Sequence, residues 1–201
     1  MKKTLLVLAV LGGIIGGFAI LYGLSATSES TYADAPTPTP FMVDARIVAV
    51  GAQVGLTQSQ LSTVHAQLGA CHDAKATACY ENATETMFIR PETMASPKLP
   101  TVLAHEYLHY VWYKMLGDQG RKITGDSLMV MYSRNDYLGT ELRWRLEPYV
   151  NLGDVPGTDA FNTELHSIWC TEVADNRMNA SSLEYCSRYI PGRNALQNTI
   201  F

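Results

Sequence analysis

The stretch Val102–Val111, with the sequence VLAHEYLHYV, decides how this chain is interpreted. It places His105 and His109 four positions apart, and Glu106 is the only acidic residue in it. Four positions are about one turn of an α-helix, so both imidazoles would project from the same face of a helix. The remaining residues are uncharged and mostly bulky, which predicts a buried helix, and buried imidazole and carboxyl groups need polar partners.

These residue types at this spacing are typical of a zinc site. Two histidines one turn apart can bind one ion, and Glu106 can act as a general base on a water at that ion without binding the metal itself. Zinc lowers the pKa of such a water towards about 7 and polarises a carbonyl group, so the pattern predicts hydrolytic chemistry. Three fixed positions recur by chance in many helices, and the apolar surroundings favour zinc over a core helix with hydrogen-bonded histidines.

The stretch resembles the HExxH motif of the zincin metallopeptidases. The resemblance implies an α+β, zincin-like fold in which a small mixed sheet packs on the motif helix. It also implies that an edge strand near the helix binds extended substrate by β-pairing, and Thr86–Arg90 is the expected strand. The metzincin branch has a glycine and a third histidine where this chain has Trp112 and Met115. The resemblance therefore narrows to the gluzincin-like branch, in which a later glutamate is the third ligand.

Glu164 and Glu172, on one predicted helix, are the candidates for that ligand. The segment Thr163–Glu172 is similar to small gluzincins in which the first glutamate of such a helix binds the metal, which favours Glu164. The segment Glu172–Asp175 is similar to the Glu-x-x-Ala-Asp signature of membrane gluzincins, but its spacing is one residue short. The expected site is therefore Zn²⁺ on His105, His109 and Glu164, with Glu172 as the alternative third ligand.

His166 is expected to be structural, because two positions along a helix from Glu164 it points to the opposite side. Hydrolysis also requires a donor that stabilises the developing oxyanion, and the spacing does not choose among several polar side chains. The candidates are Tyr137, His166, Tyr189 and Arg193.

The N-terminus predicts export. Lys2 and Lys3 precede an uncharged stretch whose apolar centre is about 20 residues long, enough to span a hydrocarbon core of about 30 Å. The lysines favour a cytoplasmic N-terminus. We therefore expect a single-pass anchor in the cell membrane over residues 1–24, with the rest of the chain extracytoplasmic. A cleaved signal peptide, which would give a secreted protein, is the alternative.

Residues 25–40 are rich in Ser, Thr and Pro and predict an extended linker, so the catalytic domain is expected over residues 41–201. An exported chain with four cysteines in two locally spaced pairs predicts two disulfides. The expected pairs are Cys71 with Cys79 and Cys170 with Cys186.

Local patterns predict short strands before the motif helix and a mainly helical half after it. The predicted strands are Arg46–Val50 and Thr86–Arg90, and Pro91 is expected to end the second strand or to leave it at a sheet edge. The segment Thr57–Gln60 has the pattern of a capping box, which opens a helix. The predicted helices are Thr57 to about Leu68, Val102–Met115, Asp126–Tyr132, Asp136–Leu146, Asp159–Thr171 and Ser182–Ile190.

The composition limits the function. Acidic and basic residues are interspersed and the net charge is −4, so nucleic acid is not an expected partner. The leading hypothesis is a zinc peptidase that uses a metal-activated water to cleave peptide bonds in exported or surface proteins. A non-catalytic, envelope-anchored binding or assembly protein and a zinc amidase acting on cell-wall peptides are the alternatives. Structural zinc is usually closed by four protein ligands, so two histidines and one glutamate favour catalysis.

Overall fold

The computed structural model describes residues 41–73 and 75–196. The described residues all belong to one compact unit, which covers residues 40–201. The predicted anchor over residues 1–24 and the linker over residues 25–40 lie outside the described residues. Within the described part, no helix is both long enough and apolar enough to cross a membrane.

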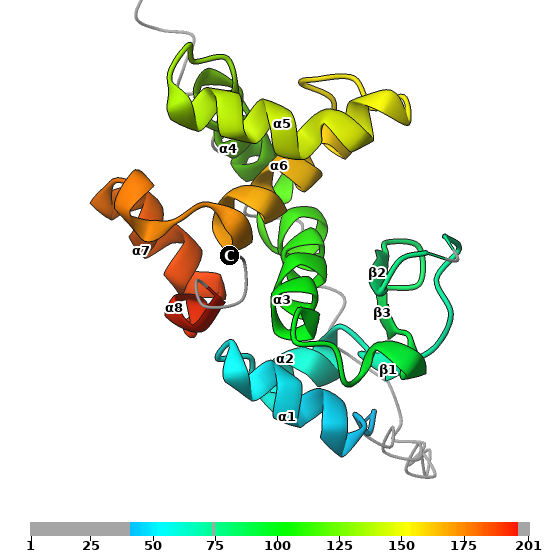
Figure 1. Cartoon of the computed structure of the whole chain (residues 1–201). Helices are drawn as coiled ribbons and strands as arrows, with labels where there is room; N and C mark the ends of the chain where they lie inside the picture. The colour runs from blue at the N-terminus through cyan, green and yellow to red at the C-terminus, as the bar shows by residue number, and fades with distance from the viewer. Residues whose placement is uncertain (1–40, 74, 197–201) are drawn as a thin grey trace, which may run out of the picture. The chain divides into compact units, whose positions relative to one another are not determined.

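The described unit has an α+β fold centred on helix α3, Leu99–Tyr110, as Figure 1 shows. Strands β1 (Gln67–Leu68), β2 (Ala78–Glu81) and β3 (Thr86–Ile89) form a mixed sheet in the order β1-β3-β2. Strand β1 runs parallel to β3, whereas β2 runs antiparallel to it. Helix α3 packs against β2 and β3, and also against α1 and α6. The predicted small mixed sheet on the motif helix is therefore confirmed.

The C-terminal half is mainly helical, also as predicted, although several helices are longer than expected. Helix α3 continues through a π-helical turn, Val111–Met115, and Gly117 then adopts a left-handed backbone with φ of 62° as the chain turns into the next helix. The helices after this turn are α4 (Gly117–Tyr132), α5 (Tyr137–Asn151), α6 (Asp159–Glu172), α7 (Ala180–Tyr189) and α8 (Arg193–Leu196). Short 3₁₀ turns cover Pro91–Thr93 and Asp175–Arg177.

The predicted strand Arg46–Val50 is wrong, because this segment lies in helix α1, Ala45–Gln53. The side chain of Asp44 caps the helix by accepting a hydrogen bond from the backbone N–H of Arg46. The buried residues of α1, Ile47 and Gly51, are one helical turn apart, so the burial has helical rather than alternating periodicity. The β-branched residues in the segment indicated a strand, but burial on one helical face outweighed that propensity.

Helix α2 spans Gln58–Thr63 and begins with the predicted capping box of Thr57 and Gln60. It ends earlier than expected, and the following residues include β1 rather than another helical turn. His65, between α2 and β1, has a positive φ of 43°.

The expectation that Thr86–Arg90 forms the edge strand is also wrong. Strand β3 pairs with β1 on one side and with β2 on the other, so it is the central strand. Pro91, which indicated an edge, comes after the strand and begins a 3₁₀ turn instead. Strand β2 is the edge strand that lies next to α3.

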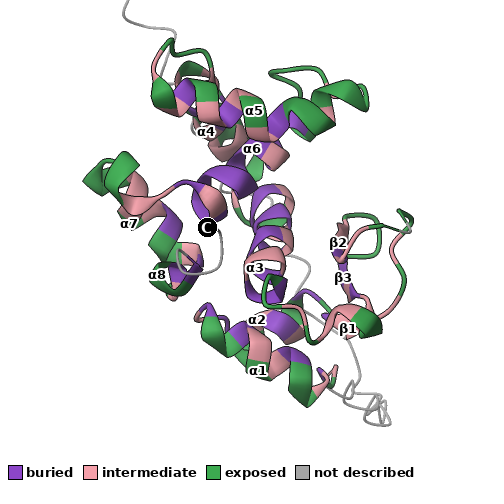
Figure 2. Cartoon of the chain, in the orientation of Figure 1, coloured by how far each residue is buried: buried purple, intermediate pink, exposed green. Residues whose placement is uncertain are grey.

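The core follows α3 and α6, the two most buried helices, as the purple ribbon in Figure 2 shows. Trp112 is fully buried just after α3, and its indole N–H donates to Asp159 at the start of α6, with 3.0 Å between Nε1 and Oδ1. This contact fixes the two helices relative to each other.

Both predicted disulfides are present, one between Cys71 and Cys79 and one between Cys170 and Cys186. The first closes the loop before β2, and the second joins α6 to α7. Disulfides persist in oxidising compartments, so they suggest an extracytoplasmic location.

Candidate metal centre

Helix α3 presents the three motif residues together. The imidazoles of His105 and His109 are buried, with 8% and 7% of their surface exposed, and their ring centroids are 4.9 Å apart. One potential ligand atom from each of His105, Glu106 and His109 can be chosen so that all lie within 4.8 Å of one another. The one-turn spacing in the sequence therefore produces a compact group of polar atoms in an apolar helix.

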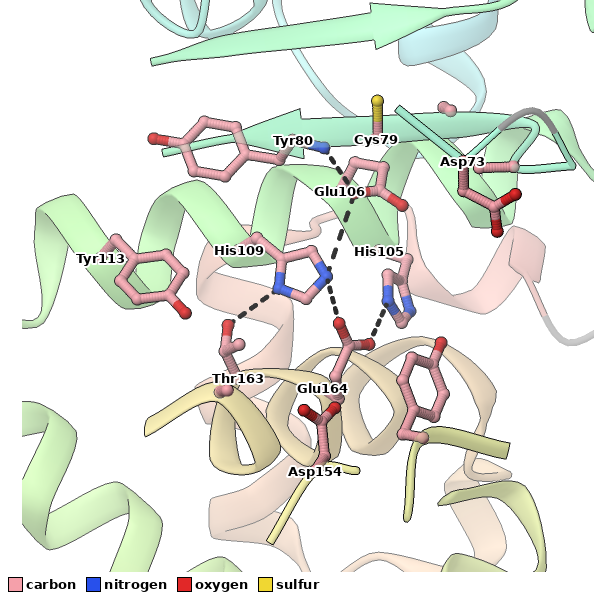
Figure 3. Close-up of a pocket in the computed structure, with 14 residues that line it drawn as sticks. Asp73, Cys79, Tyr80, His105, Glu106, His109, Tyr113, Asp154, Thr163 and Glu164 are labelled. Carbon is pink, nitrogen blue, oxygen red and sulfur yellow. Dashed lines mark hydrogen bonds and ion pairs between the residues drawn. The ribbon is translucent and has the colours of Figure 1, made fainter. Parts of the chain in front are cut away.

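Helix α6 packs across α3 and places Glu164 against both histidines (Figure 3). One carboxylate oxygen of Glu164 lies 3.2 Å from Nε2 of His105, and the other lies 3.5 Å from Nε2 of His109. Glu106 is farther away, with its Oε2 3.9 Å from Nε2 of His109. Two ligand atoms held tetrahedrally at about 2.1 Å from zinc are separated by about 3.4 Å. The spacing of the Glu164 and histidine atoms therefore fits a zinc ion.

Thr163 orients the second histidine. Its Oγ1 lies 2.8 Å from Nδ1 of His109, in a buried contact. The tautomer of His109 that donates from Nδ1 to this hydroxyl leaves the lone pair of Nε2 facing Glu164. Hydrogen bonds of this kind fix the ring and tautomer of metal-binding histidines.

Glu106 is held on the opposite side of the site, by the edge strand. The backbone N–H of Tyr80 in β2 donates to Oε2 of Glu106 across 2.8 Å. Burial raises the pKa of Glu106 to about 7, and this effect outweighs the charge of His105 and the Tyr80 hydrogen bond, which both lower the pKa. A carboxyl group with a pKa near neutrality is suited to accept and return a proton.

The pKa values of the two histidines are shifted in opposite directions. Burial opposes the charged form of His105, but its hydrogen bond to Glu164 and the charge of Glu106 raise its pKa to about 9. Burial lowers the pKa of His109 to about 4, despite the attraction of Glu164. For Glu164, burial raises the pKa, but His109, His105 and a hydrogen bond from Tyr149 together lower it. The Glu164 carboxylate is thus stabilised as an anion by its neighbours.

A cavity of about 470 Å³ opens onto these residues. Its walls include Tyr80, Tyr113 and Tyr149, and two further carboxylates, Asp73 and Asp154. The candidate metal site is therefore accessible to a molecule larger than water, although its histidines are buried.

The other candidate residues lie elsewhere. Glu172 does not line the cavity, and its Oε2 lies 2.6 Å from Nη1 of Arg145. His166 is fully buried, and its Nε2 is 3.0 Å from the hydroxyl of Tyr185, as expected for a structural residue. None of the four oxyanion candidates lines the cavity: Tyr137, His166, Tyr189 and Arg193.

Sequence reasoning missed four residues that shape the site. Thr163 adjoins Glu164 in the sequence, and this adjacency was the only available signal. Tyr80 contributes its backbone rather than its side chain, and no motif identifies such a contact. Tyr149 and Asp154 reach the cavity only because α5 packs against α6.

No protein-family model matches the chain, and no curated protein or solved structure matches it significantly. The fold and the site define an α+β protein with a candidate metal-binding group of histidines and glutamates. The likeness to zincins therefore depends on the HExxH stretch and on the geometry around it.

Replacing Thr163 with valine should lower zinc affinity about 10- to 100-fold, because His109 loses the hydroxyl that orients its ring. Competition with a chromophoric chelator measures the affinity. Thr163→Ser keeps the hydroxyl and should bind zinc nearly as tightly as the unmodified chain. Equal zinc affinity in the valine and serine variants would show that the hydroxyl does not support the site.

Proposed function

We propose that this chain is a zinc-dependent peptidase in which His105, His109 and Glu164 bind the metal. The single observation that supports this most is the convergence of both Nε2 atoms on the Glu164 carboxylate within an open cavity. Three protein ligands leave a coordination position free, as in catalytic rather than structural zinc sites. Zinc bound there would supply a water of lowered pKa and polarise the carbonyl group to be cleaved.

Glu106 is the proposed general base. Its carboxyl group adjoins the histidines but is farther from them than that of Glu164, so it can accept a proton from water without replacing a ligand. The hydrogen bond from Tyr80 fixes one of its oxygens, Oε2. The other oxygen remains to receive the proton and to return it to the leaving amine.

Strand β2 is the proposed support for an extended peptide. Residues 78–80 of this strand line the cavity, and the N–H of Tyr80 points to Glu106 instead of to β3. Within the described residues, the outer edge of β2 has no strand partner. Pairing with this edge would lay a peptide bond beside the histidines by the geometry of β-augmentation.

We propose Tyr149 as the donor that stabilises the oxyanion, in place of the four residues considered from the sequence. Its hydroxyl donates to Glu164 and lines the same cavity. The hydroxyl can therefore stabilise the Glu164 carboxylate before substrate enters. It is also a hydrogen-bond donor within the cavity, as oxyanion stabilisation requires.

The test uses the full chain purified in detergent. We expect about one zinc ion per chain by elemental analysis and cleavage of an unfolded protein substrate, with the cleavage abolished by a chelator and restored by zinc. A zinc-loaded chain that cleaves no protein would contradict the proposal. If that chain instead released cell-wall peptides, the site would belong to an amidase.

A further inference from the structure

The walls of the cavity are strongly acidic. Among the described residues, its lining includes four carboxylates, those of Asp73, Glu106, Asp154 and Glu164, and no lysine or arginine. A divalent ion at the histidines would balance the charge of two carboxylates. The remaining negative charge attracts a cationic ligand. The low dielectric of a recessed site strengthens this attraction.

Asp154 is the carboxylate best placed to bind such a ligand. It lies in the loop between α5 and α6, and it lines the same cavity as Glu164 and Thr163 (Figure 3). Its backbone N–H donates to the carbonyl of Tyr149 across 3.1 Å, which ties the loop to the helix whose tyrosine contacts Glu164. Asp154 is half-buried, and its carboxylate forms no hydrogen bond or ion pair with the part of the chain that is described.

Asp73 differs in its surroundings. It belongs to the loop closed by the Cys71–Cys79 disulfide and is exposed. One of its oxygens, Oδ1, accepts a hydrogen bond from the backbone N–H of Lys75 at 2.8 Å. Solvent and this turn already satisfy much of its charge, so Asp73 is expected to contribute less to selectivity.

We propose that Asp154 makes the cavity selective for peptides with a lysine or arginine side chain close to the bond that is cleaved. This inference rests on the proposed function, because it names the substrate class of the same site. Strand β2 and Asp154 lie on opposite sides of this cavity in Figure 3, so a cationic side chain directed from a peptide on β2 towards α6 would point to the carboxylate. The same wall repels an acidic side chain, and attraction and repulsion together determine specificity.

The binding experiment uses the zinc-loaded Glu106→Gln protein, which should bind peptide without cleaving it. Two peptides, blocked at both ends, differ only in lysine or acetyl-lysine beside the central bond, so a free terminal amine cannot supply the positive charge. We expect about tenfold tighter binding of the lysine peptide by fluorescence anisotropy. This preference should be lost in about 0.5 M salt, where the screening length is roughly half its physiological value.

Asp154→Asn in the same protein should bind both peptides equally, and Asp154→Lys should prefer a glutamate peptide. Asp126→Asn is the matched control, because Asp126 is exposed on α4, pairs with Lys122 and does not line the cavity. This control should keep the preference. The zinc content of every variant is measured, so that a lost metal is not mistaken for lost selectivity.

A preference that persists in Asp154→Asn, or an equal weakening of both peptides, would overturn the inference. Hydrolysis by the chain with Glu106 intact separates this inference from the proposed function. Equal cleavage of both peptides would support a peptidase and contradict the selectivity. A charge preference that depends on Asp154, without hydrolysis of any peptide, would support the binding site and contradict the peptidase.

Discussion

Replacing Glu164 with glutamine will lower the zinc affinity of the chain by at least about 100-fold, more than the loss of an outer hydrogen-bonding partner costs. The neutral amide removes a carboxylate whose oxygens lie 3.2 Å and 3.5 Å from the two Nε2 atoms. Glu172→Gln should leave the affinity nearly unchanged, because Glu172 is paired with Arg145 away from the cavity. A competition titration with a chromophoric chelator gives both affinities.

The two glutamine variants control for each other, since both remove one negative charge from helix α6. Urea unfolding of the metal-free proteins checks that each variant is folded before zinc is added. The reverse ranking of affinities would assign the third ligand to Glu172. Small losses in both variants would show that neither glutamate binds the metal.

Replacing Glu106 with glutamine should separate catalysis from metal binding. We expect zinc binding close to one ion per chain, with kcat/KM for a peptide reduced by about 10²- to 10⁴-fold, the usual effect of losing a general base. The amide oxygen of glutamine can still accept the N–H of Tyr80, so the edge strand should remain in place. Peptide hydrolysis and elemental analysis on the same preparation measure the two effects.

Glu92→Gln provides the control for that experiment. Glu92 is exposed, lies in the 3₁₀ turn before α3 and pairs with Arg90, outside the cavity. This variant should hydrolyse peptide at the unmodified rate. Full activity in Glu106→Gln would remove the general base from the proposal and require another group to accept the proton.

The sequence predicted the elements whose signals are local. The uncharged stretch around His105 and the capping box at Thr57 both indicated helices that the structure contains. The segment Arg46–Val50 was misassigned because a short β-branched run has no length or alternation to distinguish a strand from a buried helical face. The position of β3 in the sheet depends on pairing with β1 and β2, which no local pattern encodes.

The residues of the site also separate into those with a local sequence signal and those without one. His105, Glu106 and His109 were identifiable because one helical turn brings them together. Asp154 and Tyr149 were not identifiable, because they reach the cavity through the packing of α5 on α6 and have no fixed spacing from the motif. Every residue type except proline would supply the same backbone N–H at position 80, so no sequence pattern indicates the contact of Tyr80 with Glu106.

The contact between His105 and Glu164 joins residues 59 positions apart in the chain. An ion bound by both helices would act as a removable cross-link, because it would close that long loop and reduce the conformational entropy of the unfolded chain. Metal supply and folding would then be thermodynamically linked, and loss of the ion would loosen the junction of α3 and α6 on which the core depends.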